Sequence, residues 1–317
     1  MPLLTKELSE ESIAAVSSIG SIGIAGLIIN ITCLIRLLRT SDFKNCFGYI
    51  VRSQIFANIG TLFCFVFWSC LSIIFCIRKD IYNILDKCFG TFIIFCWNLG
   101  MYCHVFISLN RFIALFFPLR YDLLFEGKGC KIYVSLLWIV SLTHIIPFFS
   151  RSCYFIFDSN IFVWSFGSTP CSYLLSEINF DLSIAYTIFC LAIDFIIFIK
   201  LGIKSKNFKR CSKRMRQVSV AKNSYKKTAF ESTTINDKKS KKNSSSKFPI
   251  KFFMQSFCQN VLVILQMISF HFFSPYSEDT LQIMAYTTIA WNLHSSIDGL
   301  IVFFFHKEIR RNIFKCC

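Results

Sequence analysis

Seven long stretches of almost uncharged sequence limit the fold of this chain more than any other feature. Two of them, at 182–199 and 280–305, each contain a single Asp. The other five contain no Lys, Arg, Asp or Glu and lie at about 13–35, 53–77, 88–110, 132–150 and 252–275. Because about 20 apolar residues of α-helix cross a hydrocarbon layer about 30 Å thick, each stretch is long enough to span a membrane. The sequence predicts an all-α membrane protein with a seven-helix bundle.

The predicted helices divide the chain into a bundle and its connecting segments. Residues 1–12 precede the bundle, which spans 13–305, and the last segment, 306–317, forms a short amphipathic helix along the membrane surface. A long basic loop, 204–251, separates the fifth and sixth helices. The expected helices span about 13–35, 47–77, 88–117, 131–150, 178–203, 249–275 and 280–305.

Positive charge is distributed very unevenly between the two ends of the predicted bundle. The formal net charge is +16, and with the N-terminus outside, 29 of the 34 Lys and Arg lie on the cytosolic side. Without the loop 204–251, 13 still lie there against 5 outside. Basic residues near membrane spans favour the cytosolic side, so the sequence predicts an external N-terminus. Attraction to anionic inner-leaflet lipids explains the charge of this loop, and we expect no nucleic-acid partner.

Three cysteines lie on the predicted outer side, where disulfides form freely. Cys88 opens the third helix and Cys171 precedes the fifth, which favours a Cys88–Cys171 bond that ties the second outer loop across the bundle. Pairing of Cys153 with either of the other two stays open, because connectivity cannot be deduced from sequence. Between these cysteines, two aromatic and β-branched runs in 154–164 flank an Asp-Ser-Asn turn, which predicts a β-hairpin lid.

A few polar side chains fall within the predicted helices, where an ionisable group is costly unless it is paired or faces water. Asp298 lies in the cytosolic half of the last helix, and Asn30 and Asn58 should lie at a similar depth in the first two. The three are expected to form a hydrogen-bonded network, with simple interhelical packing contacts as the alternative. Asp194 is interpreted as a residue near the cytosolic interface.

No arrangement of residues in the sequence indicates chemistry or a bound metal. The histidines are scattered over several helices without a helical pair at metal-ligand spacing. Motifs for a nucleophile elbow, a phosphate loop or paired carboxylates are absent from the sequence as well. The sequence therefore predicts no enzyme activity, no metal and no cofactor.

The cytosolic end offers two further candidate sites. Arg111 lies near the end of the third helix, between Asn110 and Phe112, where it can reach neighbouring helices or a cytosolic partner. Anchoring of the helix end in lipid headgroups is the alternative role for this arginine. Cys316 and Cys317 follow an amphipathic segment and are candidate palmitoylation sites, although an unmodified C-terminus is equally compatible with the sequence.

Six parts of the chain also carry a family resemblance. They are Gly26-Leu-Ile-Ile-Asn30, Asn45-Cys-Phe-Gly-Tyr-Ile-Val-Arg-Ser-Gln54, Leu109-Asn-Arg-Phe-Ile-Ala-Leu-Phe-Phe-Pro-Leu-Arg-Tyr121, Trp138, Pro170-Cys171-Ser172 and Ser295-Ser-Ile-Asp-Gly-Leu-Ile-Val302. Together they resemble the nematode serpentine chemoreceptors, most closely serpentine receptor class x, nearly from end to end. The resemblance implies a rhodopsin-like receptor architecture, coupling to heterotrimeric G proteins, and a place in the plasma membrane of sensory neurons, in their cilia.

The resemblance also implies roles for individual residues. The Asn110-Arg111-Phe112 segment looks like the Asp-Arg-Tyr motif of rhodopsin-like receptors, which implies a G-protein coupling site. Asp298 and Gly299 fall where those receptors have Asn-Pro, and Asn58 falls where they usually carry Asp. The chain departs from that pattern in having Asn before Arg111, so the preceding residue supplies no local ion pair.

The predicted function is that of a chemosensory G-protein-coupled receptor, which binds an external small molecule or peptide and does no chemistry on it. Asn98, Tyr102 and Trp291 are the candidate ligand-binding residues, in an aromatic pocket under the lid. A seven-helix ligand-gated channel or transporter is the alternative, and it should show a polar pore face, broken helices or an internal repeat. No repeat relates the two halves of the sequence.

Overall fold

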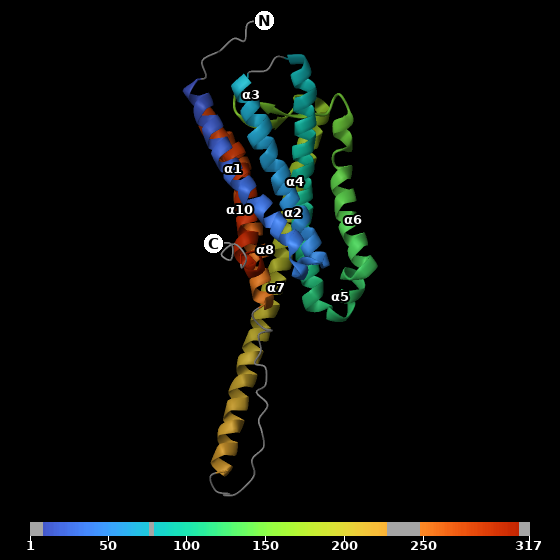
Figure 1. Cartoon of the computed structure of the whole chain (residues 1–317), viewed down its shortest axis with the longest axis vertical. Helices are drawn as coiled ribbons and strands as arrows, with labels where there is room; N and C mark the ends of the chain where they lie inside the picture. The colour runs from blue at the N-terminus through green and yellow to red at the C-terminus, as the bar shows by residue number, and fades with distance from the viewer. Residues whose placement is uncertain (1–8, 76–78, 227–247, 311–317) are drawn as a thin grey trace.

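The computed structural model describes residues 9–75, 79–226 and 248–310, and in them the chain forms one elongated helix bundle with a small sheet at one end (Figure 1). The helices are α1 Glu10–Arg39, α2 Cys46–Phe63, α3 Cys70–Phe75, α4 Lys79–Phe116, α5 Pro118–Phe125, α6 Gly127–Thr143, α7 Pro170–Lys226, α8 Phe248–Ile268, α9 Thr280–Met284, α10 Ala290–Phe305 and α11 Lys307–Arg310. The strands are β1 Phe155–Asp158 and β2 Val163–Phe166.

Short helical turns of other types complete the elements. Three are 3-10 helices, η1 Ser41–Phe43, η3 Ile146–Phe149 and η5 Ser274–Tyr276. Three are π-helical, η2 Cys64–Ser69, η4 Ser269–Phe273 and η6 Ala285–Ile289. The π-helical segments continue α2 into α3, extend α8, and join α9 to α10, so each of these membrane helices contains a local widening.

Six of the described helical segments are long and apolar enough to cross a membrane. They are Glu10–Arg39, Cys46–Phe75, Ile84–Phe116, Pro170–Ile203, Met254–Tyr276 and Thr280–Phe305. The 17-residue α6 packs beside α4 and α2 as the seventh helix of the bundle. The predicted all-α, seven-helix membrane fold is therefore confirmed, with the β1–β2 hairpin added to it.

Local sequence signals explain where several helices begin and end. The side chain of Ser9 accepts a hydrogen bond from the backbone N–H of Ser12, and Asn45 caps α2 in the same way through Gly48. Pro118 begins α5 and ends α4, because a proline ring has no N–H to continue the preceding helix. Each boundary thus follows from the chemistry of a single residue.

The packing of α1 against α10 depends on a close approach at Gly299. A Cβ atom on Gly299 would lie 2.3 Å from Oδ1 of Asn30, so only glycine fits there without displacing that side chain. On the outside of the bundle large apolar side chains are exposed, including Ile28 (62%), Ile132 (69%) and Phe195 (65%). Exposed apolar surface of this kind is what helices in contact with lipid require.

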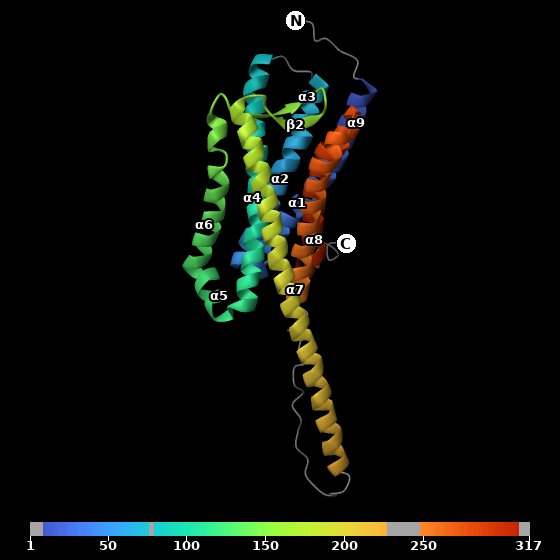
Figure 2. The same ribbon diagram turned by 180° about the vertical axis from the view of Figure 1, so that it is seen from behind.

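The two ends of the bundle differ in structure. One end, which we call the hairpin end, carries β1 and β2; the other, the α5 end, carries α5 and η1. Figure 2 shows α7 running along the bundle beside α4 and α8 and continuing well past the α5 end. The part of the long loop after Lys226 falls outside the described residues until α8 begins at Phe248.

Candidate functional site

A two-stranded antiparallel hairpin closes one end of the bundle. Phe155 lies opposite Phe166, and Asp158 lies opposite Val163. This pairing confirms the hairpin that the sequence predicts. Because Phe155 and Trp164 are 4% and 3% exposed, the apolar face of the hairpin is packed against the helices and forms part of the core.

Buried polar contacts attach the hairpin to the helices. A carboxylate oxygen of Asp86, in α4, accepts hydrogen bonds from Nε1 of Trp68 at 2.7 Å and from the backbone N–H of Phe157 at 3.1 Å. Nε1 of Trp164 donates to Oγ of Ser69 at 3.0 Å. The hairpin is thus fixed to both α4 and η2 by donors that would otherwise be buried without a partner.

The turn of the hairpin adopts a strained backbone conformation at Phe162, where φ is 58°. Bulky residues rarely occupy this left-handed region, which costs conformational energy. The Phe162 side chain is 3% exposed, and its carbonyl accepts a hydrogen bond from Oγ1 of Thr288 at 2.7 Å. Core packing and the contact with η6 therefore hold this turn in place.

The disulfide differs from the favoured prediction. Cys153 bonds to Cys171, with 5.2 Å between their Cα atoms, whereas Cys88 is free and exposed, so the favoured Cys88–Cys171 pair was wrong. The reason is that strand pairing continues past the hairpin, where the N–H of Gly167 donates to the carbonyl of Tyr154 at 3.0 Å. This extension brings Cys153 beside the start of α7, so the bond closes the base of the hairpin.

Removing this disulfide should destabilise the protein more than removing the free cysteine. We expect the double variant Cys153→Ser/Cys171→Ser to lose about 3 kcal/mol of unfolding free energy, typical for a loop of this length. Cys88→Ser should unfold like the wild type. Thermal unfolding in detergent, followed with a thiol-reactive dye that labels buried cysteines as they become accessible, measures both. Equal losses in the two variants would contradict the observed pairing.

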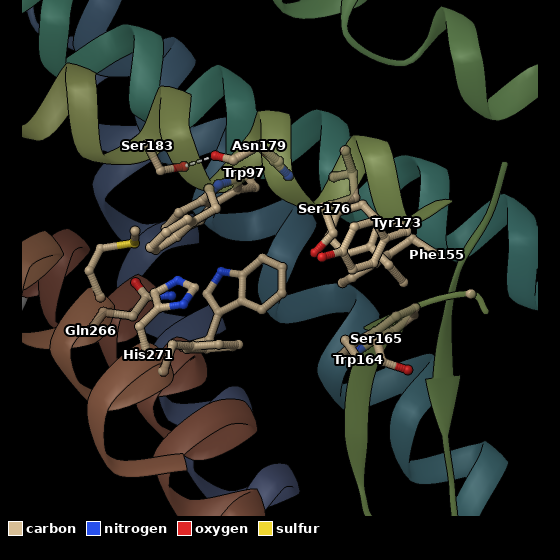
Figure 3. A pocket seen from close by; sticks show the side chains of 17 residues that line it. Trp97, Phe155, Trp164, Ser165, Tyr173, Ser176, Asn179, Ser183, Gln266 and His271 are labelled. Atoms are coloured by element: carbon tan, nitrogen blue, oxygen red, sulfur yellow. Dashed lines mark hydrogen bonds between the residues drawn. The ribbon is translucent and has the colours of Figure 1, made fainter. Parts of the chain in front are cut away.

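A cavity of about 370 Å³ lies beneath the hairpin, bounded by α4, α7, α8 and α10 (Figure 3). Trp97 of α4, Trp164 of β2 and Trp291 of α10 form much of its wall. Tyr173 of α7 and His271 of η4 also line it and are exposed, whereas Trp164 and Trp291 are buried. The cavity therefore opens between α7 and η4 at the hairpin end.

Of the three candidate ligand-binding residues, only Trp291 lines this cavity. Asn98 is turned back on its own helix, where its Nδ2 donates to the carbonyl of Ile94 at 3.0 Å. The hydroxyl of Tyr102 lies 2.8 Å from that of Tyr186, deeper in the bundle between α4 and α7. The sequence did not reveal which face of α4 points into the cavity, and Asn98 and Tyr102 lie outside its lining.

Gln266 is a cavity residue that the sequence analysis missed. Its side chain is 5% exposed, and its Oε1 has no hydrogen-bond partner among the residues that the structure describes. A buried amide oxygen without a donor is unusual in folded proteins. The uncharged run 252–275 contains four amide side chains, Gln255, Gln259, Asn260 and Gln266, and nothing in the sequence distinguishes Gln266 from the other three.

Towards the α5 end, the structure brings the three predicted network residues together. Nδ2 of Asn58 donates to Oδ2 of Asp298 at 2.7 Å and lies 3.4 Å from Oδ1 of Asn30. Asn30 in turn donates to the carbonyl of Ser295 at 3.2 Å. These contacts connect α1, α2 and α10 through buried side chains.

Two glutamines that the sequence analysis missed complete this network. Nε2 of Gln54 lies 2.9 Å and 3.2 Å from the two carboxylate oxygens of Asp298, and Nε2 of Gln259 donates to Oδ1 at 2.8 Å. The ring Nε2 of His104, in α4, lies 3.5 Å from Gln54. Asp298 is 1% exposed, so it serves as a shared buried acceptor for amides on α2 and α8.

Arg111 lies seven residues beyond His104 on α4, closer to the α5 end. Its three guanidinium nitrogens are buried and have no hydrogen-bond partner within the described part of the chain. The guanidinium carbon lies 5.5 Å from the ring centroid of Phe47, and Asp194 of α7 attracts it electrostatically. Asp194 is 1% exposed and accepts a hydrogen bond from Asn260 at 2.7 Å, so its expected interfacial position was wrong.

The sequence profile of one family matches most of the chain, over residues 21–233 and 219–306, and its description is serpentine type 7TM GPCR chemoreceptor Srx. The chain belongs to this family. Serpentine receptor class X-43 of Caenorhabditis elegans is 23% identical over 302 residues, which cover 92% of this chain and 83% of that protein. Serpentine receptor class X 45 of the same organism is 22% identical over 297 residues, covering 90% and 76%.

The other two residues of the Arg111 segment position the α5 end of this Srx receptor. Nδ2 of Asn110 lies 3.4 Å from the hydroxyl of Tyr121, which connects α4 to α5. The ring of Phe112 stacks on that of Phe116 with 4.5 Å between centroids. Asn110 therefore does not pair with Arg111, and the charge that faces Arg111 comes from α7.

Two remaining expectations concern palmitoylation and metals in the Srx receptor. The short helix α11, Lys307–Arg310, follows α10 directly, but Cys316 and Cys317 lie outside the described residues. Across 9–75, 79–226 and 248–310, no group of three or more His, Cys, Asp or Glu is arranged to hold a metal ion.

Proposed function

We propose that this multi-pass Srx receptor binds an external ligand in the cavity under the hairpin and activates a heterotrimeric G protein at the α5 end. The ligand acts by binding and undergoes no chemical change. In this proposal the hairpin end and the N-terminus face outside, in agreement with the strong excess of Lys and Arg at the other end. The receptor then belongs in the plasma membrane, in the cilia of sensory neurons.

One observation supports this proposal above the others. The α4 helix contributes Trp97 to the cavity at one end and carries Arg111 at the other, whose buried guanidinium has no hydrogen-bond partner among the described residues. Between them, His104 of the same helix touches the amide network around Asp298. A change in the cavity can therefore reach the α5 end along α4, which contacts the Asp298 network between the two sites.

The mechanism requires two arrangements of the bundle with different affinities for the ligand. A ligand that binds one of them more tightly shifts the population towards it. In the arrangement described above, the guanidinium nitrogens of Arg111 are buried, and Asp194 of α7 attracts them. In the active arrangement, α7 moves away, Arg111 becomes accessible, and the G protein binds beside it.

The basic loop 204–251 has a separate role in this proposal. It contains 16 basic residues and two acidic ones, and its first part, up to Lys226, is the end of α7 that continues past the α5 end. Anionic inner-leaflet lipids attract such a segment. In the resting receptor this attraction acts on the part of the basic segment that lies nearest the α5 end.

Replacing Arg111 tests the proposed function. In cells with a promiscuous Gα subunit, we expect Arg111→Ala to reduce the ligand-evoked calcium response at least about tenfold, because the active arrangement loses its contact with the G protein. Surface staining should match the wild type. The control is Arg39→Ala, which removes an exposed arginine at the same end and should signal normally.

Two results would speak against a G-protein-coupled mechanism. The first is an unchanged calcium response in Arg111→Ala. The second is a ligand-evoked current in membranes without G protein, which would favour the ligand-gated channel.

A further inference from the structure

We infer that the cavity under the hairpin takes an uncharged, mainly apolar compound of one or two rings that donates a hydrogen bond to Gln266. This inference rests on the proposed function only in naming that compound as the signalling ligand. It is carried by four properties of the cavity: its charge, its walls, its size and the unsatisfied amide of Gln266.

The lack of Asp, Glu, Lys and Arg in the described cavity wall disfavours an ionic ligand. None of the described lining residues is Asp, Glu, Lys or Arg. A carboxylate or an ammonium group that entered would lose its hydration without gaining a counter-ion, and this is costly in a buried apolar site. Peptides with free termini and amino acids are therefore poor ligands for this cavity.

The walls of the cavity favour flat rings. Trp97 and Trp291 meet edge to face with 5.4 Å between their ring centroids. Phe155 and Trp164 are stacked with 5.8 Å between centroids. Aromatic walls in both orientations accept a flat ring by stacking on one side and by edge contact on the other, which adds to the free energy of apolar burial.

The size of the cavity limits the number of rings. An apolar protein cavity of about 150 Å³ holds one benzene molecule. The cavity here is about 370 Å³, which leaves room for two fused or linked rings but not for a folded peptide. Ligand pockets in proteins start at about 300 Å³, so this one lies at the small end of the range.

Gln266 gives the cavity its polar specificity. The hydroxyl of Ser183, which also lines the cavity, already donates to the carbonyl of Asn179 at 2.7 Å. Oε1 of Gln266, by contrast, is buried and lacks a donor within the described residues. A ligand hydroxyl or N–H supplies that donor when the Gln266 amide turns its oxygen towards the cavity, whereas an ether of the same shape leaves the oxygen unsatisfied.

Direct binding to the purified receptor tests this inference without any G protein. Three of the five tryptophans line the cavity, so bound rings should change the intrinsic tryptophan fluorescence. The probes are phenol, 2-naphthol and 4-hydroxybiphenyl, each compared with its methyl ether and with the carboxylate of the same ring system. We expect the two-ring hydroxyl compounds to bind about tenfold more tightly than their ethers, and the carboxylates not to bind.

Two variants test whether the preference for a hydroxyl compound over its ether depends on the amide of Gln266. Gln266→Leu should remove the tenfold difference between hydroxyl compound and ether, while leaving the ether's own affinity within about twofold. The control, Gln282→Leu, makes the same change at an exposed position of α9 and should keep the wild-type preference. Fluorescence of the unliganded variants verifies that the tryptophans remain in the same environment.

Each other outcome overturns a defined part of the inference. Carboxylates that bind as tightly as the hydroxyl compounds would overturn the uncharged class. A preference that persists in Gln266→Leu would overturn the role of this residue, and the absence of binding by every probe would overturn the ligand class. Because G protein is absent from this assay, probes that bind here but evoke no calcium response in cells would instead contradict the proposed function.

Discussion

Gly90→Ala is expected to displace the hairpin from α4 and to weaken ligand binding in the cavity beneath it. A Cβ atom at position 90 would lie 1.6 Å from the carbonyl oxygen of Phe155. That oxygen belongs to the backbone of β1, so no side-chain rotation can make room for the methyl group. Since Phe155 also lines the cavity, movement of β1 changes the binding site directly. We expect a loss of about 3 kcal/mol of stability and a fall in affinity of at least about tenfold.

The matched control for Gly90→Ala lies in the same helix. A Cβ atom on Gly100 would meet nothing closer than the Cβ of Ala57 at 3.9 Å, an ordinary contact distance. Gly100→Ala should therefore be neutral or slightly stabilising, because alanine favours a helix more than glycine does. Thermal unfolding and the fluorescence titration measure both variants. Similar behaviour of the two would show that the hairpin does not depend on close approach to α4.

Asp298→Ala should be the most destabilising change in the half of the bundle near the α5 end. The variant removes the acceptor shared by Gln54, Asn58 and Gln259, so three buried amides lose their shortest hydrogen bonds. Interhelical hydrogen bonds in membranes contribute about 0.6 kcal/mol each on average, but an unsatisfied buried group costs about 1–3 kcal/mol. We expect a total loss of about 3 kcal/mol, low surface expression and no ligand response.

Asp298→Asn separates the effect of charge and acceptor capacity from that of shape. Asparagine has nearly the same size, yet its amide nitrogen would face other donors where Asp298 now accepts four hydrogen bonds. This variant should therefore be destabilised almost as much as Asp298→Ala. Asn292→Ala, in the same helix, removes one hydrogen bond to the carbonyl of Ile19 and serves as the reference for a single contact. Wild-type stability of the Asp298→Asn receptor would show that these residues act only as interhelical packing contacts.

Charge-free runs and polar residues within them predict much of this fold. The uncharged stretches correspond to membrane helices because lipid imposes length and apolarity on each span. Asp298 was identifiable since an ionisable residue at such a position is rare, and Asn30 and Asn58 followed from their depth in neighbouring helices. Depth along a helix is a property of the sequence alone.

The rotation of a helix about its own axis, unlike depth along it, cannot be read from the sequence alone. Tyr102 and Trp97 lie five residues apart on α4, but only Trp97 faces the cavity, and which one does depends on how α4 packs against α7 and α8. Gln54 and Gln259 reach Asp298 for the same reason, and neither carries a charge that would mark it in the sequence. The disulfide depended on strand pairing beyond the hairpin, which brings Cys153 to Cys171 rather than to Cys88.

The π-helical segments η2, η4 and η6 all lie in the half of the bundle that carries the hairpin. A π-helical turn holds one residue more than an α-helical turn, and one residue corresponds to about 100° of rotation around a helix. Deletion of one residue from η4 would rotate His271 relative to Gln266. Different side chains of η4 would then line the opening of the cavity. The Asp298 network, at the other end of the same helices, would keep its contacts. Gain or loss of single residues in these segments is thus a route by which ligand preference can diverge during evolution while the part of the receptor nearer the α5 end stays the same.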